Sequence, residues 1–388
     1  MSRSAVLSLA FALSALPAAL PVAAQTKYIA FGDSITEAEG TDDPSRPCPE
    51  DCGYPGRLED LLAAAGMPSV VVNAGRGGET TSEGLSRLDA VLAQEGGDVL
   101  LLMEGTNDVH RFISPETIAF NLAEMARRAG NRGLTTIHAT LLPRVPDATV
   151  DRDNEVTQQV SWEIRELAYL RDRDLADPFE VFLNRPNVFA ELYFAGSDPV
   201  GHPNAAGYDL LAGIFFDVIR GVDSVPPVPG GLTPEDGSSG VSSEAEVELR
   251  LYDFGAGIDV GATELLIDGS VVEAEKIGDP RILDLRYQPA GGFSGVVEVG
   301  YRTRDRAAAP NQRERTLGTF SIAGTRFILG DVNEDGRVDG IDLVELALRF
   351  GSVNGGPRYG RHIDLNEDDV IDGADLAILA SNFGRSSG

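Results

Sequence analysis

Four separate stretches of the sequence carry side chains that together could perform acyl transfer. Ser34 lies in GDSIT, Asn107 lies in MEGTNDVH, and Asp198 and His202 lie in SDPVGHPN. A serine hydroxyl is a poor nucleophile unless a base takes its proton and hydrogen-bond donors stabilise the developing oxyanion. The imidazole and the amide are such groups, and the glycines of VNAGRGGETT could add backbone N–H donors. Gly-Asp-Ser alone is also an ordinary turn or helix N-cap sequence, so the prediction depends on all four stretches meeting.

The elements predicted around these stretches bring them to one edge of a sheet. Residues 26–222 alternate short apolar runs (KYIAF, SVVVN, DVLLLME, LTTIHATLL) with segments that carry apolar residues at helical spacing. This alternation predicts an α/β fold, with a parallel sheet covered by helices on both faces. Three of the stretches follow predicted strands and the fourth precedes the last helix. We therefore expect them at the carboxyl edge of the sheet.

Two other histidines are weaker candidates for this chemistry. His138 lies inside an apolar strand, where a histidine of the core is the more typical interpretation. His110 follows GTNDV and is expected to lie in a solvent-facing loop, although it could line a substrate cleft.

In this order, the four stretches resemble the conserved blocks of the SGNH (GDSL) hydrolases across residues 26–222. The resemblance implies a flavodoxin-like three-layer α/β/α fold and a serine esterase. It makes Ser34 the nucleophile, with the Ser34 N–H, the Gly78 N–H and the Asn107 amide as oxyanion donors. His202 would be the general base, oriented by Asp198. The sequence DPVGH has one residue more than the D-x-x-H of the family, so a backbone carbonyl could orient the imidazole instead.

The start of the chain and its charge bear on location and partners. Arg3, the apolar stretch AVLSLAFALSALPAAL and the small residues up to Ala24 predict a signal peptide over residues 1–24, with a retained anchor as the alternative. We expect a secreted protein, extracellular or periplasmic, without a membrane span. The formal charge of −29, from 32 Lys and Arg against 61 Asp and Glu, argues against a nucleic-acid partner.

The two cysteines, Cys48 and Cys52, are expected to form a structural disulfide in an exported protein, worth about 2 kcal/mol. Their spacing is not the C-x-x-C of a redox or zinc pair.

Beyond the first domain the composition changes twice. Residues 223–239 contain VDSVPPVPGG and LTPEDGSSG and are predicted to be a linker. Residues 240–326 carry period-two apolar runs between Gly, Pro and Asp turns, which predict a small β-sandwich. This stretch resembles the Ig-like accessory modules of exported bacterial proteins, and no residue in it suggests catalysis.

The C-terminal stretch contains an acidic repeat, DVNEDGRVDGID and DLNEDDVIDGAD, each followed by a predicted helix. Oxygen donors recur at loop positions 1, 3, 5, 9 and 12, and a backbone carbonyl is available at position 7; Ca²⁺ binds such sets. The predicted ligands are Asp331, Asn333, Asp335, Arg337 (carbonyl), Asp339 and Asp342, then Asp364, Asn366, Asp368, Val370 (carbonyl), Asp372 and Asp375. Position 6 is Gly336 in the first loop and Asp369 in the second, so we expect the first site to be tighter.

Residues 328–388 resemble a dockerin module, a small helical domain with two calcium loops. The resemblance implies docking to a cohesin-like protein partner, and a purely structural calcium module is the alternative. With the first domain, it suggests an esterase that removes acyl groups from polysaccharide, acetyl being the first candidate. Lipid esters or thioesters are alternative substrates, and a non-catalytic, calcium-dependent binding or assembly protein is the alternative class. No cofactor is expected for catalysis.

Overall fold

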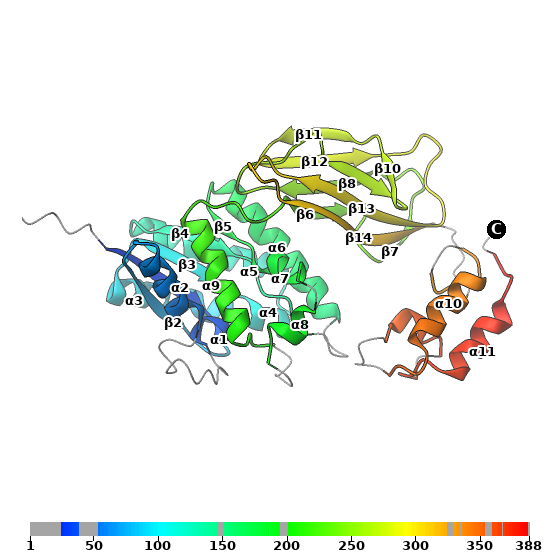
Figure 1. The fold of residues 1–388 in the computed structure, drawn as a ribbon, viewed down its shortest axis with the longest axis horizontal. Coiled ribbons are helices and arrows are strands. Elements are labelled where there is room, and N and C mark those ends of the chain that lie inside the picture. The colour runs from blue at the N-terminus through cyan, green and yellow to red at the C-terminus, as the bar shows by residue number, and fades with distance from the viewer. Residues whose placement is uncertain are drawn as a thin grey trace, which may run out of the picture.

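The computed structural model contains an α/β domain, a β-sandwich and a small helical module in that order along the chain (Figure 1). The described residues are 25–38, 53–145, 151–185, 187–194, 201–323, 329–333, 336–353, 359–366 and 368–386. The predictions for the signal peptide, for Cys48 and Cys52, for Asp198 and for Asp335 lie outside the described residues.

The α/β domain is built on a parallel sheet with the strand order β2-β1-β3-β4-β5. Its strands are β1 (Thr26–Gly32), β2 (Ser69–Gly75), β3 (Val99–Met103), β4 (Thr135–Ala139) and β5 (Leu175–Ala176). The longer helices are α2 (Tyr54–Ala64), α3 (Thr81–Glu95), α5 (Pro115–Asn131), α6 (Asp151–Leu170) and α9 (Ala205–Ile219). The short helices are α1 (Ser34–Glu37), α4 (Thr106–His110), α7 (Pro178–Leu183) and α8 (Val188–Glu191).

Both faces of this sheet are buried, because successive strand residues point to opposite sides. In β1, Tyr28 and Ala30 join the core formed with α2 and α9. Ile29 and Phe31 join the core formed with α3, α5 and α6. The result is a three-layer α/β/α arrangement, which confirms the predicted fold class.

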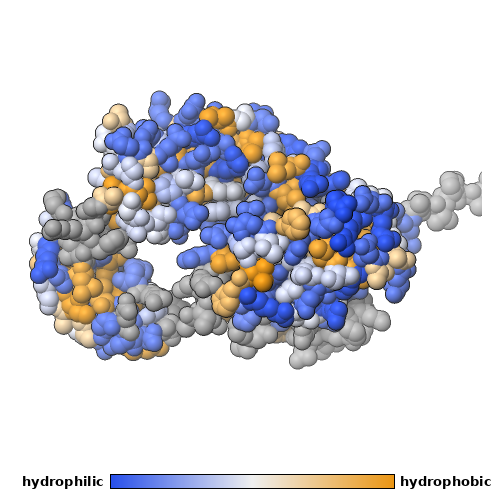
Figure 2. All heavy atoms as spheres, turned by 180° about the vertical axis from the view of Figure 1, so that it is seen from behind, coloured by the Kyte–Doolittle hydropathy of each residue, from blue (hydrophilic) through white to orange (hydrophobic). Residues whose placement is uncertain are grey.

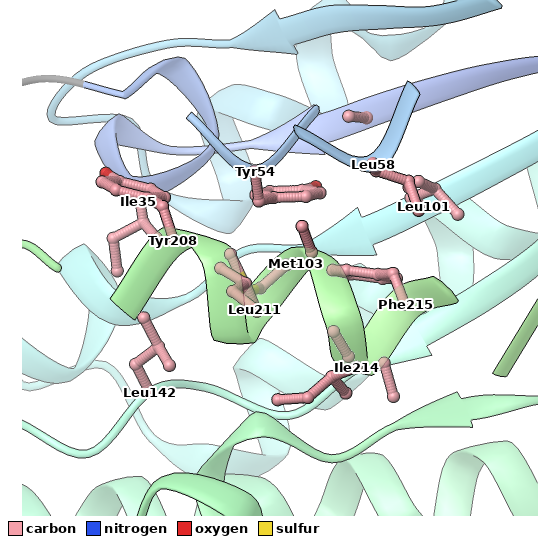
Figure 3. Close-up of a cluster of buried hydrophobic side chains, with 14 of the residues drawn as sticks. Ile35, Tyr54, Leu58, Leu101, Met103, Leu142, Tyr208, Leu211, Ile214 and Phe215 are labelled. Carbon is pink, nitrogen blue, oxygen red and sulfur yellow. The ribbon is translucent and has the colours of Figure 1, made fainter. Parts of the chain in front are cut away.

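Helices α2 and α9 pack against each other and share a hydrophobic core with α1, the short helix that follows β1. The rings of Tyr54 and Phe215 stack with their centroids 4.9 Å apart. Figure 3 shows Tyr208 of α9 beside Ile35 of α1 in the same cluster. The N-terminal part of α9 therefore packs next to the turn that follows β1.

The second part of the chain is a β-sandwich of two sheets, with the orders β10-β9-β13-β14-β7 and β11-β12-β8-β6. Its strands are β6 (Val228–Thr233), β7 (Ser238–Val241), β8 (Val247–Tyr252), β9 (Glu264–Ile267), β10 (Ser270–Val272), β11 (Glu275–Asp279), β12 (Ile282–Tyr287), β13 (Val296–Arg304) and β14 (Gln312–Ile322). Leu249 and Leu283 from one sheet share a core with Val299 and Phe320 from the other. The period-two apolar runs thus form a two-sheet core.

The structure differs from the predicted linker at residues 223–239, because most of this segment belongs to the sandwich. β6 pairs with β8 as an edge strand, where Pro229 is tolerated at a register shift. The backbone at Gly230 packs closely against the Tyr252 ring. A Cβ atom at this position would lie 2.1 Å from the ring, so a larger residue does not fit. Val228 and Leu232 are buried. Pro229 is therefore part of an edge strand, and Gly230 allows the close contact with Tyr252.

The α/β domain and the sandwich pack directly on each other through α6, which contacts β6 (Figure 1). Arg165 of α6 is buried and pairs with Asp177 at 2.8 Å, and it also donates to the carbonyl oxygen of Pro229 in β6. Glu180 of α7 is buried and pairs with Arg313 and Arg315 of β14. These charges are removed from water together, so the interface depends on their mutual pairing.

The C-terminal module consists of α10 (Gly340–Arg349), the 3-10 turn η1 (Arg361–Ile363) and α11 (Gly373–Asn382). Its core joins equivalent positions of the two sequence repeats, Val338 with Ile371 and Leu346 with Leu379. The copies therefore pack on each other around a shared core.

No helix in the described part of the chain is both long enough and apolar enough to cross a membrane.

Candidate active site

Ser34 lies at the carboxyl end of β1, in the first turn of α1. The Asp33 side chain caps this turn by accepting a hydrogen bond from the Ile35 N–H at 3.0 Å. The turn lies close to β2: a Cβ at Gly75 would lie 2.1 Å from the backbone nitrogen of Glu37. Ser34 is 4% exposed. The hydroxyl is thus held on a capped turn, as a strand-to-helix nucleophile requires.

His202 is brought to Ser34 by the segment that precedes α9. Asn204 caps α9 through the Gly207 N–H, and its side-chain amide donates to the carbonyl oxygens of Glu191 and Tyr193. His202 Nε2 lies 2.9 Å from Ser34 Oγ, and both residues are buried. An imidazole at this distance can accept the hydroxyl proton.

Asn107 and Gly78 lie on segments that follow β3 and β2, two strands that both neighbour β1. Asn107 is in α4, directly after β3, and its Nδ2 donates to the carbonyl oxygen of Glu79 at 2.9 Å. Gly78 has a φ of 71°, which favours glycine, and its carbonyl oxygen accepts a hydrogen bond from Arg111 at 2.9 Å. The structure therefore joins Ser34 to His202, and it joins Asn107 to the loop that contains Gly78. Asp198 lies outside the described residues.

An arginine-centred network that the sequence analysis missed supports this loop. Arg87 of α3 pairs with the buried carboxylate of Glu79 and donates to the carbonyl oxygen of Ala74 at 2.9 Å. Its guanidinium lies 4.0 Å from the centre of the Phe31 ring. One side chain thus contacts β1, β2 and the loop after β2. No local sequence pattern distinguishes Arg87 from a surface arginine of the same helix.

A second buried network ties the region after β3 to the helices beneath it. Asp108 accepts hydrogen bonds from the backbone nitrogen and the hydroxyl of Thr81 at 2.8 and 2.6 Å. Asn121 of α5 donates to the same hydroxyl at 2.9 Å. Asp108 follows Asn107, so these bonds help to hold the candidate oxyanion donor in place.

The site also contains carboxyl groups whose environment disfavours ionisation. Burial raises the pKa of Asp33 to about 6. Burial, with the carboxylates of Glu79 and Asp33, raises the pKa of Glu104 well above its usual range. Neither carboxyl oxygen of Glu104 has a hydrogen-bond partner among the described residues. The surroundings of Glu104 therefore favour its neutral form, because an isolated buried carboxylate would be costly.

Two further histidines, His138 and His110, lie on different elements. His138 is buried in β4, and neither ring nitrogen has a hydrogen-bond partner within the described residues. Burial lowers the pKa of His138 to about 4, so the ring is neutral at physiological pH. His110 is exposed at the end of α4.

The acidic loops of the C-terminal module present a matched arrangement that fits Ca²⁺. Asp342 is fully buried and accepts hydrogen bonds from the backbone nitrogens of Val332, Asn333 and Asp339. The equivalent Asp375 is also fully buried and accepts from Leu365, Asn366 and Asp372. Over the described residues, no ion pair links either carboxylate to an arginine or lysine. A calcium loop combines such an acidic residue with the carboxylate, amide and carbonyl oxygens of the other loop positions as ligands.

At position 6 the two loops adopt the same backbone conformation with different residues. Gly336 has a φ of 82° and Asp369 has a φ of 69°. This left-handed conformation costs little for glycine and more for aspartate.

Two of the three domains, the α/β domain and the C-terminal module, match known protein families. Residues 30–210 match the GDSL-like lipase/acylhydrolase family, and residues 329–383 match the dockerin type I domain, a type of domain that binds calcium. Both predicted resemblances are thereby confirmed, whereas the Ig-like assignment of the sandwich stays a prediction.

Two curated relatives are esterases. Esterase TesA of Pseudomonas aeruginosa is 38% identical over 111 residues, covering 29% of this chain and 51% of that protein. An arylesterase of Vibrio mimicus is 31% identical over 146 residues, covering 38% of this chain and 66% of that protein. The chain thus matches half of the length of the first relative and just under two thirds of the second.

Among solved structures, a lipase/acylhydrolase from Enterococcus faecalis is 26% identical, with a TM-score of 0.43, covering 51% of this chain and 96% of that one. By its family matches, this protein contains a hydrolase domain of the GDSL-like lipase/acylhydrolase family and, in its C-terminal part, a dockerin type I domain.

Proposed function

We propose that the protein is a secreted serine esterase that hydrolyses carboxylic esters through an acyl-enzyme. The observation that carries the proposal is the 2.9 Å contact between Ser34 Oγ and His202 Nε2 at the carboxyl edge of the parallel sheet. The family match and the two esterase relatives support the same reaction class.

In the proposed reaction, His202 accepts the hydroxyl proton as Ser34 Oγ attacks the ester carbonyl carbon. The carbonyl oxygen becomes an oxyanion and accepts hydrogen bonds from the Ser34 N–H, the Gly78 N–H and Asn107 Nδ2. His202 then returns its proton to the leaving alkoxide, and an acyl-enzyme remains. A water molecule, deprotonated by His202, releases the acid and restores Ser34.

The orienting group for His202 is proposed to be the Asp198 carboxylate, with a backbone carbonyl as the competing candidate. An Asp198→Asn variant decides between them, because loss of a carboxylate that orients the base lowers kcat by orders of magnitude. An unchanged kcat would assign the role to a carbonyl.

The proposed substrate is an acylated polysaccharide, with acetyl as the first acyl group to test. This part rests on the association of the hydrolase domain with a dockerin type I domain. The same domain supports an extracellular location.

The C-terminal module is proposed to bind two Ca²⁺ ions and to dock onto a cohesin-like protein. The ion ligands are those predicted from the repeat, with Asp342 and Asp375 buried at the two loop ends. Apolar side chains gather on part of this module in Figure 2. Ile341, Val344 and Leu348 lie at helical spacing on α10 and are 56%, 57% and 61% exposed. An exposed apolar stripe of this kind is typical of a docking surface.

The first experiment measures hydrolysis of p-nitrophenyl esters of increasing acyl length by wild type, Ser34→Ala and His202→Ala. Ser82→Ala is the matched control, because Ser82 is an exposed serine at the start of α3. We expect activity in wild type and in the control, and loss of at least about a thousandfold in the two site variants. Activity surviving in Ser34→Ala would refute the assigned nucleophile.

Acyl length and acetate release define the substrate class. A preference for acetyl esters, with acetate released from acetylated polysaccharide, supports the proposal. A preference for long acyl chains would favour a lipolytic esterase or thioesterase. A folded wild type that hydrolyses no ester would favour a binding protein.

Docking is tested by binding of a cohesin domain to the full chain in Ca²⁺ and in chelator. We expect calcium-dependent binding that weakens in Val344→Glu, with the exposed Leu170→Glu of the α/β domain as the control. Binding that chelator leaves unchanged would contradict the proposed role of calcium.

A further inference from the structure

Three aspartates come together where the α/β domain meets the sandwich. Asp223 follows α9, Asp253 directly follows β8, and Asp305 directly follows β13. One carboxylate oxygen of each lies within 4.8 Å of the corresponding oxygens of the other two. None of the three belongs to the candidate active site or to the acidic repeats.

One oxygen of this cluster is buried without a partner. Asp253 is 4% exposed, and its Oδ1 accepts hydrogen bonds from the backbone nitrogens of Gly255 and Gly257, both at 2.8 Å. Its Oδ2 is buried and has no hydrogen-bond partner within the described residues. A carboxylate oxygen of Asp253 also lies within 4.8 Å of a carboxylate oxygen of Asp223 and of one of Asp305, so this buried, half-partnered carboxyl group is part of the cluster.

The negative charge of the cluster is not balanced by side chains. In the part of the chain that the structure describes, no ion pair joins Asp223, Asp253 or Asp305 to an arginine or lysine. Burial, together with the nearby carboxylates of Asp223 and Asp305, raises the pKa of Asp253 to about 6. Placing three acids this close without a cation would be costly at neutral pH.

We propose that Asp223, Asp253 and Asp305 bind one Ca²⁺ ion that links the α/β domain to the sandwich. Ca²⁺ is bound by oxygen ligands at about 2.4 Å, so two ligands on opposite sides of the ion are about 4.8 Å apart. The three carboxylate oxygens lie within this span of one another, so a single Ca²⁺ ion can contact all three. Mg²⁺ demands a near-ideal octahedron and usually keeps several waters, whereas Ca²⁺ accepts several carboxylates in a flexible geometry, which favours Ca²⁺ at a site with three aspartates.

The surroundings of the cluster hold its side chains in place and leave room for water ligands. Asn311 donates from its side chain to Asp305 Oδ2 at 2.6 Å and to the carbonyl oxygen of Asp223 at 3.3 Å. The Ala256 N–H donates to Asp223 Oδ2 at 2.6 Å. A cavity of about 410 Å³ borders Asp223 and Asp253, and water in it could complete the coordination of the ion.

The close fit of this loop to Asp223 indicates a specific junction. A Cβ at Gly255 would lie 2.2 Å from Asp223 Cγ, so only glycine allows the approach. An ion held by segments of both domains stabilises the junction, because it binds only when both domains are folded and in contact.

The test counts bound Ca²⁺ in the full chain after the acidic repeats are disabled. The background variant carries Asp331→Ala, Asp342→Ala, Asp364→Ala and Asp375→Ala, one change at each end of each loop. We expect calorimetric titration to give one equivalent of Ca²⁺ in this background and none after adding Asp253→Asn. Asp259→Asn is the matched control, because Asp259 pairs with the nearby Arg304 outside the cluster.

Unfolding of the junction provides a second measurement that needs no active enzyme. The chain has a single tryptophan, Trp162 of α6, which packs against the sandwich core. In the background variant, we expect Ca²⁺ to raise the unfolding temperature reported by Trp162 fluorescence, and Asp253→Asn to abolish this rise. No bound ion in the background variant, or an equivalent that survives Asp253→Asn, would overturn the proposal. Both readouts are independent of ester hydrolysis.

Discussion

The side-chain nitrogen of Asn107 donates to the carbonyl oxygen of Glu79 at 2.9 Å, although Asn107 follows β3 and Glu79 follows β2. A side-chain amide carries two N–H groups, so this bond orients the amide and leaves its second N–H for another acceptor. Arg87 in turn holds the Glu79 side chain. The candidate oxyanion donor is thus positioned before any substrate arrives, which is what electrostatic stabilisation of a transition state requires.

Asn107→Ala is expected to lower kcat by about 10²- to 10³-fold with a much smaller change in KM, because the lost hydrogen bond forms mainly in the transition state. Steady-state kinetics on a short-chain p-nitrophenyl ester measure this. Asn121→Ala is the control: it removes another buried asparagine, which bonds to Thr81, and it should reduce stability more than kcat. Equal losses of kcat in both variants would contradict the assigned role.

Asp33 is expected to make stability depend on pH. Its folded pKa of about 6 lies above the ordinary value of 3.8, so the protonated group favours the folded state below pH 4. This contribution is lost as the pH rises through 6, at a cost of about 3 kcal/mol.

Asp33→Asn keeps a side-chain oxygen for the helix cap and removes this cost. Its stability relative to wild type should therefore increase between pH 4 and pH 8 in urea unfolding. A difference that does not change with pH would show that Asp33 has an ordinary pKa.

His138 is expected to act in the opposite direction. Its folded pKa of about 4 lies below the ordinary 6.5, so the neutral ring contributes stability above pH 6.5 that is lost as the pH falls towards 4. The loss amounts to about 3 kcal/mol. His138→Leu removes the titration and two unpartnered ring nitrogens, and should raise stability more at pH 5 than at pH 8. The exposed His110→Leu should leave the pH dependence unchanged.

Glu180 is expected to couple the α/β domain to the sandwich. Glu180→Ala leaves buried arginines without their acid and should cost about 3–5 kcal/mol of unfolding free energy. Urea unfolding followed by Trp162 fluorescence measures this loss. Asp172→Ala is the control, because it removes an exposed ion pair with Arg281. It should cost less than about 1 kcal/mol of unfolding free energy. Similar losses in both variants would argue against the buried network.

Asp369 is expected to weaken the second calcium loop. Asp369→Gly removes the strain of a non-glycine residue in the left-handed conformation. It should tighten Ca²⁺ binding at that loop by about two- to fivefold, which is equivalent to up to about 1 kcal/mol. Calorimetric titration resolves this change, and Asp369→Asn controls for the lost charge. A gain of the same size in the asparagine variant would attribute the effect to charge.

Much of the fold could be predicted because its signals are local. Apolar alternation along residues 26–222 indicated strands and helices, and the carboxyl ends of parallel strands must meet at one edge. The order of Ser34, Asn107 and His202 therefore indicated a common site before any distance was known. The acidic repeat was similarly informative, because a calcium loop takes its ligands from fixed positions within a single twelve-residue segment.

The sequence alone thus determined the fold class, the paired acidic loops and the residue types at the candidate site. Only the tertiary structure decided that β6 belongs to the sandwich, that Arg87 supports the Gly78 loop, and that Asp223, Asp253 and Asp305 meet. These features depend on burial and on partners far apart in the chain. A carboxylate has the same local sequence whether it lies in water or beside two other buried acids, so packing alone distinguishes the two cases.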